Sequence, residues 1–370
     1  MANHQTDRWV PELTSVRAFA AWAICITHAA FWTGGYTDDL AGRIAARFEI
    51  GVTVFFVLSG FLLFRPWVAA LSDGPRPNLR RYARHRITRI LPGYWITVLV
   101  VYALDIWPRG GAEHIAAEKA SADVPGTGLE GLLRTMTFWQ SAEFGWFHPG
   151  LSQMWSLVVE VGFYLVLPLV GMAVWWLCRG QWRPVRAALI VVAFGLVSPL
   201  WLWAVHACDS LEMIALLWPP GYFDWFAAGM LMAIGSRCGW QVPAWVGWPI
   251  AAVFAALAVT PIAGPATLVP ADLSTVLAKN VVYLLLGVAI MAPVMLGGIS
   301  WLRHPVLVWL GENSYEFFLV HLIVMEYVMP LLGYPLFTGS MWLVLVVTTA
   351  VAVPVAWGLR VLTDAITGRN

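Results

Sequence analysis

The sequence is poor in charged residues and in cysteine. Asp, Glu, Lys and Arg make up 12% of the 370 residues, whereas soluble proteins carry about 25%. The 22 basic and 21 acidic residues leave a formal net charge of +1, and without a basic surplus a nucleic-acid-binding protein is excluded. The four cysteines have no CxxC or Cys/His spacing. This excludes a disulfide-stapled fold, and no metal site is expected.

The sequence is correspondingly rich in apolar residues. Hydrophobic residues account for 60% of the chain, against about 45–50% in soluble proteins, and a water-facing surface cannot hold such an excess. The 23 Trp are typical of side chains that anchor a protein at membrane–water interfaces. We therefore predict an all-α, polytopic transmembrane helical bundle that forms a single membrane domain over residues 1–370.

Long apolar runs give the expected spans. A helix that crosses a bilayer needs about 20 mostly apolar residues. Runs of this kind predict about ten spans, near residues 13–33, 48–70, 90–107, 152–178, 187–207, 219–236, 245–263, 277–299, 313–332 and 340–362. The first run follows a polar N-terminus and has no small-residue cleavage site behind it, so we expect a membrane helix there and not a signal peptide.

Basic residues indicate the orientation of the bundle. With the N-terminus inside the cell, most arginines fall on the cytoplasmic side, including the seven of the 65–89 loop, as the positive-inside rule requires. Both termini are then expected in the cytoplasm of a multi-pass protein of the plasma or inner membrane. Twenty Arg against two Lys are typical of a high-GC genome, which suggests a bacterial source.

Two ionisable residues lie in the first predicted span. Arg17 and His28 are eleven residues apart, which on an α-helix is about 20° beyond three full turns, so both side chains share one face about 16 Å apart. Arg17 alone could be an interfacial arginine whose charge reaches the water. A histidine deep in a span is a stronger functional candidate, because its imidazole is the side chain best suited to proton transfer near neutral pH.

A pair of arginines precedes the third predicted span. Arg86 and Arg89 are one helical turn apart, just before Leu91-Pro92. Positive-inside topology explains most arginines of this loop, but two guanidinium groups on one face can also hold phosphates by bidentate hydrogen bonds. A cytosolic donor that carries a nucleotide would fit this pair. The sequence has no Walker or GxGxxG loop as a competing phosphate site.

Further polar residues occur within the apolar runs. Glu160 lies deep in the fourth span, where a carboxylate must be neutral or paired with Arg or His. His321 in the ninth span could form a second polar cluster with Glu316 and Glu326, or make structural hydrogen bonds between helices. Ser59 belongs to a pair of small residues in the second span that would allow a helix or a ligand to approach closely.

Five short motifs follow one another along residues 13 to about 330. They are Arg-x10-His (Arg17, His28), Phe-Phe-Val-Leu-Ser-Gly-Phe (55–61), Arg-x-x-Arg-Ile-x-Pro-x-Tyr (Arg86, Arg89, Pro92, Tyr94), Trp-Ser-Leu-x-x-Glu-x-x-Phe-Tyr (Trp155, Ser156, Glu160, Phe163, Tyr164) and Ser-Tyr-x-x-x-Leu-x-x-His (Ser314, Tyr315, Leu319, His321). In this order they resemble the acyltransferase family 3 of integral membrane proteins, in its stand-alone form without an SGNH domain. The last motif departs from the family pattern at Glu316 and Phe317-Phe318, where less acidic residues are usual.

The resemblance implies an acyl-coenzyme A-dependent O-acyltransferase. Such an enzyme transfers an acyl group, usually acetyl, from cytosolic acyl-coenzyme A to a hydroxyl of an envelope glycan, a glycolipid or a macrolide-type small molecule. The expected partners are therefore the bilayer, acetyl-coenzyme A or another acyl-coenzyme A, and a carbohydrate or glycolipid acceptor, without a metal or nucleic acid.

The resemblance also implies roles for individual residues. Arg86, Arg89, Tyr94 and Ser59 are expected to bind the donor, and Arg17 to position it. His28 is expected to act as a general base on the acceptor hydroxyl or as an acyl-carrying nucleophile, with Glu160 orienting a partner. Four further side chains of the motifs would bind substrate or form a structural polar cluster: Trp155, Tyr164, Tyr315 and His321.

A transporter or flippase for a glycolipid or small molecule is the alternative function. It would use the same intramembrane Arg, His and Glu as a proton or substrate path. Paired inverted repeats are typical of transporters, and the sequence shows none. Release of free thiol from acetyl-coenzyme A would distinguish the acyltransferase from the transporter.

Overall fold

The described part of the chain is helical. The computed structural model describes residues 10–72, 74–106, 125–267 and 271–368, and their regular structure consists of α- and 3-10 helices. The longer helices are α1 (Pro11–Trp32), α3 (Ile50–Ser72), α4 (Leu79–Ile106), α7 (Trp155–Leu177), α12 (Leu273–Leu296), α14 (Ser314–Leu331) and α15 (Met341–Thr367). The shorter α-helices are α2 (Leu40–Arg47), α6 (Leu129–Met136), α8 (Pro184–Gly195), α9 (Val197–Ala207), α10 (Phe223–Arg237), α11 (Ala244–Val259) and α13 (Pro305–Glu312). The 3-10 helices are η1 (Pro125–Thr127), η2 (Pro149–Met154), η3 (Met213–Leu217), η4 (Pro219–Tyr222), η5 (Pro261–Ala263) and η6 (Ser300–Arg303).

Eight helical segments of the described residues are long and apolar enough to cross a membrane. They are Pro11–Trp32, Leu40–Ser72, Leu79–Leu104, Pro149–Leu177, Pro184–Ala207, Leu273–Leu296, Ser314–Leu331 and Met341–Thr367. The other two predicted spans fall on α10 and α11, whose 15 and 16 residues are fewer than the roughly 20 of a full crossing. The all-α membrane fold is therefore confirmed for the described residues, whereas the total of ten spans stays a prediction. The end of the third predicted span, at residue 107, lies outside the described residues.

Polar side chains cap several helices just before their apolar residues begin. Asp39 accepts a hydrogen bond from the backbone N–H of Gly42 at 2.7 Å and so caps α2. Asp272 does the same for α12 through Thr275 at 3.1 Å. Because the first N–H groups of a helix have no partner within it, these caps fix where the helices start.

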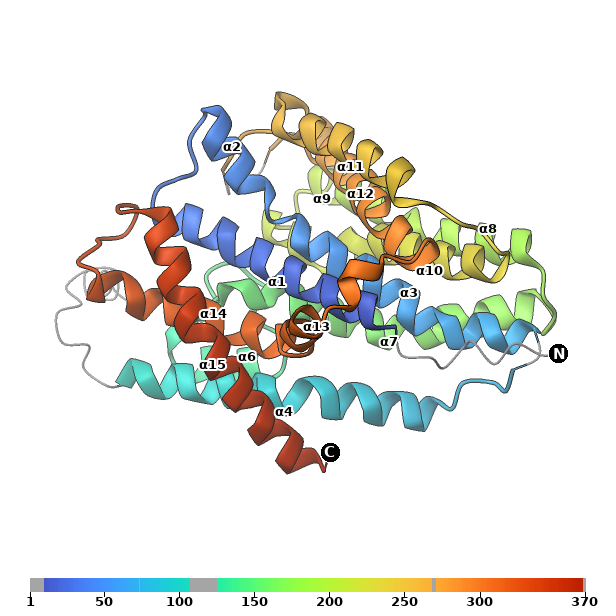
Figure 1. Ribbon diagram of the computed structural model, residues 1–370, viewed down its shortest axis with the longest axis horizontal. Helices are drawn as coiled ribbons and strands as arrows, with labels where there is room; N and C mark the ends of the chain where they lie inside the picture. The colour runs from blue at the N-terminus through green and yellow to red at the C-terminus, as the bar shows by residue number, and fades with distance from the viewer. Residues whose placement is uncertain (1–9, 73, 107–124, 268–270, 369–370) are drawn as a thin grey trace.

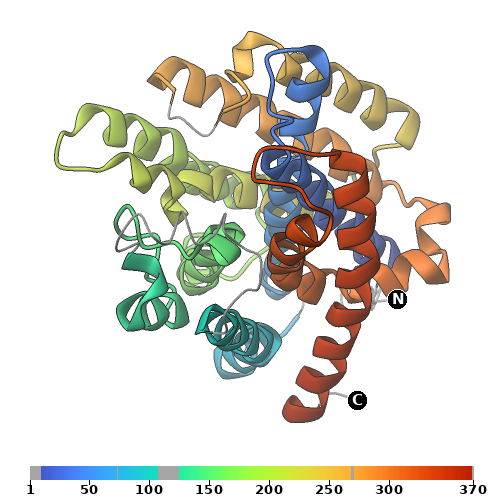
Figure 2. The same cartoon turned by 90° about the vertical axis from the view of Figure 1, so that its left-hand side faces the viewer.

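The helices form a bundle with α1 and α3 at its centre. Most of the long helices run along the longest axis of the molecule (Figure 1), and the view along that axis in Figure 2 shows α1 and α3 surrounded by the other helices. α1 packs against α3, α13, α14 and α15, while α3 packs against α7, α10 and α12. The motifs of the first, second, fourth and ninth predicted spans are thereby brought together around α1 and α3.

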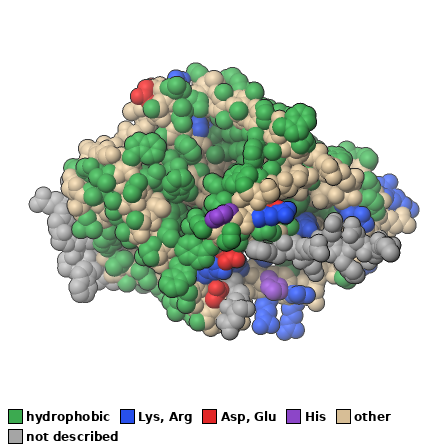
Figure 3. Space-filling view, viewed as in Figure 1, with side chains coloured by type: hydrophobic (Ala, Val, Ile, Leu, Met, Phe, Trp, Pro, Cys, Tyr) green, Lys and Arg blue, Asp and Glu red, His purple; other side chains and the backbone are tan. Residues whose placement is uncertain are grey.

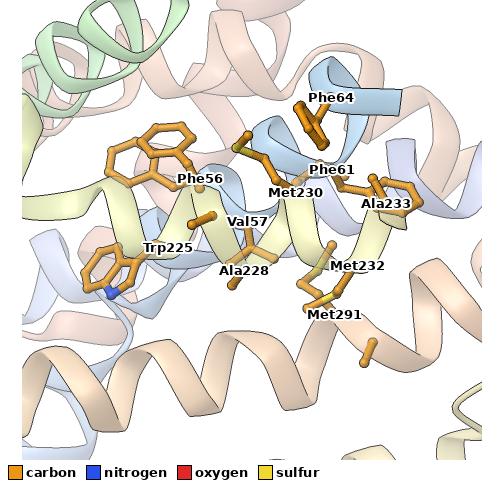
Figure 4. Close-up of a cluster of buried hydrophobic side chains, with 14 of the residues drawn as sticks. Phe56, Val57, Phe61, Phe64, Trp225, Ala228, Met230, Met232, Ala233 and Met291 are labelled. Atoms are coloured by element: carbon orange, nitrogen blue, oxygen red, sulfur yellow. The ribbon is translucent and has the colours of Figure 1, made fainter. Parts of the chain in front are cut away.

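Glycines allow α3 and α10 to pack backbone to backbone. A Cβ atom at Gly60 would overlap the carbonyl of Phe226, and one at Gly229 would overlap the carbonyl of Val57. The ring of Phe226 stacks on that of Phe56, with centroids 4.5 Å apart. Figure 4 shows this apolar cluster between the two helices. This contact fixes the position of α3 relative to α10, and with it the position of Ser59, the neighbour of Gly60.

Charged side chains are unevenly distributed over the surface. Lys and Arg lie mainly in the right-hand and lower parts of the face in Figure 3, where α4 begins (Figure 1), and the left part is mostly apolar. The first turns of α4 carry the exposed side chains of Arg80, Arg81 and Arg84. This distribution agrees with a basic side of the protein, while the assignment of that side to the cytoplasm stays a prediction.

Candidate active site

A cavity in the bundle is lined by three guanidinium groups. It has a volume of about 100 Å³ and lies between α1, α3, α4, α7 and α14. Its polar lining consists of Arg17, Ser59, Arg86, Arg89, Ser156, Glu160, Tyr164, Ser314 and Tyr315. Three cations and one carboxylate therefore face a single cavity, and its net positive charge suits an anionic ligand.

Aromatic rings hold the two arginines of α4. The guanidinium carbon of Arg86 lies 5.6 Å from the ring centroid of Tyr164, and that of Arg89 lies 5.5 Å from the ring centroid of Tyr315. Both distances are within the range of a cation–π interaction. The hydroxyl of Tyr315 donates to the carbonyl of Ile90 at 2.8 Å, which ties the start of α14 to α4. The guanidinium groups are thus held without being fully neutralised.

Glu160 is the counter-charge of the cavity. Its Oε1 accepts hydrogen bonds from Ser59 Oγ at 2.9 Å and from the hydroxyl of Tyr164 at 2.5 Å. Two donors on one oxygen are what an ionised carboxylate accepts. Arg17 interacts electrostatically with Glu160 and with both Arg86 and Arg89. Glu160 therefore offsets part of the repulsion among three neighbouring guanidinium groups.

A pair of histidines lies one helical turn beyond the cavity. His28 Nδ1 is 2.8 Å from His321 Nε2, and the two rings are nearly parallel at 9°. Ile24 and Phe318 line the cavity and stand one turn before His28 and His321 on their helices. His321 is completely buried, and its Nδ1 lies 2.8 Å from the carbonyl oxygen of Phe318. The face of α1 that carries Arg17 in the cavity thus continues to the histidine pair.

Three of the predicted donor-site and substrate residues, Tyr94, Trp155 and His321, do not line the cavity. Tyr94 is fully buried, donates its hydroxyl to the carbonyl of Thr135 at 2.7 Å and stacks on Phe138, so it joins α4 to the α6 region. Trp155 packs against Tyr222 with ring centroids 5.2 Å apart. Ser59, Tyr164 and Tyr315 line the cavity as described above.

The structure pairs His321 with His28, and not with the acidic residues of its own helix. Glu326 lies against η2, where a Cβ on Gly150 would be 2.7 Å from its Oε2. Glu316 is buried and interacts electrostatically with Arg89 and Arg360. Of the two sequence-based interpretations of His321, the contact between helices is the one that the described side chains form.

The sequence analysis gave no role to three residues around Glu160 and the arginines, although two of them, Ser156 and Ser314, belong to the quoted motifs. Ser156 and Ser314 line the cavity, and the hydroxyl of Tyr82 donates to the carbonyl of Tyr164 at 3.1 Å. Ser156 lies one turn before Glu160, so its helical spacing was a usable signal. Tyr82 had none, because it lies in the basic loop far from Tyr164 in the sequence. In the described ranges, no three His, Cys, Asp or Glu side chains gather as metal ligands would.

Fold and site together define a polytopic membrane protein with a cationic cavity that adjoins a histidine pair. The acyltransferase-domain model of acyltransferase family 3 matches residues 10–361, and the chain belongs to this family. The family resemblance seen in the five motifs is thereby confirmed.

Known relatives are acyltransferases of bacteria. The chain is 29% identical to acyltransferase MdmB of Streptomyces mycarofaciens over 357 residues, which cover 90% of this chain and 83% of MdmB. It is 25% identical over 203 residues to the peptidoglycan O-acetyltransferase OatA of Listeria monocytogenes, covering 54% of this chain and 29% of OatA. It is 27% identical over 174 residues to the O-acetyltransferase OatA of Staphylococcus aureus, covering 45% of this chain and 25% of that protein. The chain thus spans less than a third of either OatA protein, and no solved structure matches it significantly.

Proposed function

We propose that this acyltransferase moves an acyl group, with acetyl as the first candidate, from acyl-coenzyme A to a hydroxyl group of an envelope glycan or glycolipid. One observation carries the proposal: a cavity lined by Arg17, Arg86 and Arg89 lies one helical turn from the pair of His28 and His321. Such a site offers an anion-binding region beside a group that can take a proton.

The arginines would bind the phosphates of coenzyme A. Guanidinium groups match phosphate geometry and remain charged in a protein interior. The exposed arginines at the start of α4 lie on the same helix as Arg86 and Arg89. We therefore propose that the donor enters from the basic side, which we assign to the cytoplasm together with both termini, and that its pantetheine arm extends along α1 toward His28.

His28 would act as the general base. In this step Nε2 of His28 takes the proton of the acceptor hydroxyl while the oxygen attacks the thioester carbonyl. The C–S bond then breaks, and the leaving thiolate takes the proton back from Nε2, so that coenzyme A leaves as the thiol. The alternative is an acyl-His28 intermediate, formed when Nε2 itself attacks the thioester. Rapid acid quench with labelled acetyl-coenzyme A distinguishes the two, because only the second puts label on the protein before the acceptor is added.

The acceptor class rests on the relatives. One of them is named a peptidoglycan O-acetyltransferase, which suggests a carbohydrate hydroxyl at the membrane surface. MdmB, which the chain covers far more completely, is named only an acyltransferase. An acceptor assay therefore needs peptidoglycan fragments, envelope glycolipids and a macrolide-type small molecule as separate arms.

The test uses the full chain in proteoliposomes with [14C]acetyl-coenzyme A. We expect thiol release together with transfer of label to one acceptor arm, and loss of at least about 100-fold in rate for His28→Ala. His206→Ala is the matched control, because His206 is a half-buried helical histidine that hydrogen-bonds carbonyls of Leu202 and Ala271. Wild-type protein that moves a labelled glycolipid across the bilayer without consuming acetyl-coenzyme A would replace the proposal by the transporter function.

A further inference from the structure

The hydrogen bonds of His321 determine where its proton lies. Its Nδ1 is 2.8 Å from the carbonyl oxygen of Phe318 and 3.2 Å from that of Phe317. Carbonyl oxygens only accept hydrogen bonds, so Nδ1 must carry the hydrogen. In a neutral imidazole the other nitrogen is then unprotonated and carries a lone pair. Nε2 of His321 is therefore an acceptor.

The same reasoning extends to the partner ring. Nδ1 of His28 lies 2.8 Å from Nε2 of His321, and two lone pairs at that distance would repel each other. Nδ1 of His28 must therefore donate the hydrogen bond, and Nε2 of neutral His28 is unprotonated and carries a lone pair. We infer that His321 is a positioning residue that holds His28 in the tautomer with a basic Nε2 and shares the positive charge formed during the reaction. This inference rests on the proposed role of His28 as general base.

The positive charge that His28 gains with the proton of the acceptor hydroxyl can pass to His321 and return, so that neither histidine gains or loses a proton over the whole reaction. When His28 Nε2 takes the hydroxyl proton, His28 becomes an imidazolium whose Nδ1–H still points at His321 Nε2. Transfer of that Nδ1 proton to His321 puts the charge on a ring whose Nδ1–H already donates to two carbonyls. The proton returns to His28 as His28 Nε2 protonates the thiolate, so the pair ends as it began. No other proton source is needed.

A neutral orienting ring suits the interior of a membrane. Many catalytic histidines are oriented by a carboxylate, which would bring an unfavourable permanent charge into an apolar span. His321 is completely buried, and the rings of Phe317 and Phe318 have centroids 5.7 and 5.8 Å from its own. An imidazole anchored on main-chain carbonyls gives the same orientation and is uncharged in the resting state.

Kinetics of two substitutions test the inference. We expect His321→Ala to lower kcat by about 10–100-fold, as is usual for loss of an orienting partner, with KM for acetyl-coenzyme A unchanged within about twofold. His321→Gln places an amide oxygen where it can accept from His28 Nδ1–H but cannot take a proton. We therefore expect kcat of His321→Gln to be about tenfold higher than that of His321→Ala. His206→Gln is the control, since its Nδ1 contacts a carbonyl one turn back, at 2.7 Å, as His321 does. Wild-type kcat in His321→Ala, or no recovery with Gln, overturns the inference.

Nitrogen NMR of the wild-type protein provides a second measurement, which does not depend on activity. With [15N]histidine labelling and the His28→Ala spectrum for assignment, His28 should show a protonated Nδ1 and an unprotonated Nε2. A proton on Nε2 in the resting protein contradicts the inference directly. Loss of thiol release in His28→Ala together with a wild-type rate in His321→Ala would overturn only this inference, whereas a wild-type rate in His28→Ala would overturn the proposed function.

Discussion

Arginine residues of α4 differ in what their side chains face. Arg86 lines the cavity beside Tyr164, while Arg84, on the same helix, is exposed and is not part of the lining. The motif identified Arg86 and Arg89 from their spacing alone, because residues three apart share one helical face. The local pattern was sufficient here, since both residues lie on one element.

Removal of Arg86 should weaken donor binding more than removal of Arg84. Loss of a charge-assisted contact costs about 1.5–3 kcal/mol, so we expect Arg86→Ala to raise KM for acetyl-coenzyme A by about tenfold or more. Arg84→Ala, the matched control, should change KM by less than about threefold. Initial-rate kinetics over a range of donor concentrations measure both, and equal effects would move the donor phosphates to the exposed end of α4.

Neutralising Glu160 should reveal the repulsion among the guanidinium groups. Glu160→Gln keeps an oxygen that can accept from Ser59 and Tyr164 but removes the only carboxylate among the described residues of the cavity lining. We expect a lower Tm without ligand and a larger Tm increase on adding coenzyme A, because the anion then supplies the missing charge. Thermal unfolding with and without coenzyme A checks this. Equal Tm values and equal ligand shifts would show that Glu160 is not the balancing charge.

The histidine pair shows where residue-level prediction from sequence stops. The helical spacing of Arg17 and His28 placed both on one face of α1, and the cavity and the pair lie along that face. His28 and His321 are 293 positions apart, and no local spacing relates them. Their contact depends on how α1 packs against α14, which is a tertiary property. Tyr94 illustrates the converse, since its motif placed it near Arg89 but its side chain points to Thr135.

At the scale of helices, the apolar runs predicted most of the elements. Apolar length alone located the segments that became α1, α3, α4, α7, α12, α14 and α15. Apolar length alone did not separate α8 from α9, which meet at Leu196, because the apolar run continues through both. The predicted runs 219–236 and 245–263 extend beyond α10 and α11 into the 3-10 helices η4 and η5.

The crossing of α3 and α10 should tolerate no side chain at Gly60. An added Cβ would overlap the Phe226 carbonyl, and overpacking of this kind costs about 1–3 kcal/mol. We expect Gly60→Ala to lower Tm and activity together. Gly358→Ala is the control, because a Cβ there meets nothing within 4 Å in α15 and alanine favours a helix by about 0.5–1 kcal/mol. Thermal unfolding in one detergent compares them, and an unchanged Tm for Gly60→Ala would contradict the close packing.

The cap of α12 should stabilise the protein in a pH-dependent way. The hydroxyls of Ser274 and Thr275 and the backbone N–H of Thr275 hold the pKa of Asp272 below its usual value. A lowered pKa means that this stabilisation is present above the unfolded pKa of about 4 and is lost as pH falls through the folded pKa. We expect Asp272→Ala to lower Tm at pH 7, and the difference from wild type to shrink only as pH falls below about 4. Asp272→Asn, which can still cap the helix, should lower Tm less than Asp272→Ala at pH 7. A difference from wild type that does not change with pH would show that the charge of Asp272 does not stabilise the protein.

For the whole molecule, composition predicted the class and left the arrangement open. The low charge content and the long apolar runs led to a helical membrane bundle, and the described residues form one. Composition could not show that α1 and α3 lie at the centre (Figure 2), because that order depends on packing between distant segments. The bias of arginines toward one side predicts the orientation but does not measure it.

Two natural cysteines can measure the orientation. Cys208 follows α9 and Cys238 follows α10, and both side chains are exposed, whereas Cys25 and Cys178 are buried. With both termini in the cytoplasm and all ten predicted spans crossing, Cys208 lies outside and Cys238 inside. A membrane-impermeant maleimide should therefore label Cys238→Ser protein in intact cells, and label Cys208→Ser protein only after permeabilisation. The reverse pattern would invert the bundle and place the proposed donor entrance outside the cell.

The anchor of His321 also has a genetic consequence. The groups that accept from its Nδ1 are carbonyl oxygens of the main chain at Phe317 and Phe318, and every amino acid supplies the same oxygen. No point mutation at either position deletes the acceptor, although it can alter the packing around the ring. Of the groups that orient His28, only the imidazole of His321 belongs to a side chain. Substitution of His321 is therefore the missense change that removes the orienting group.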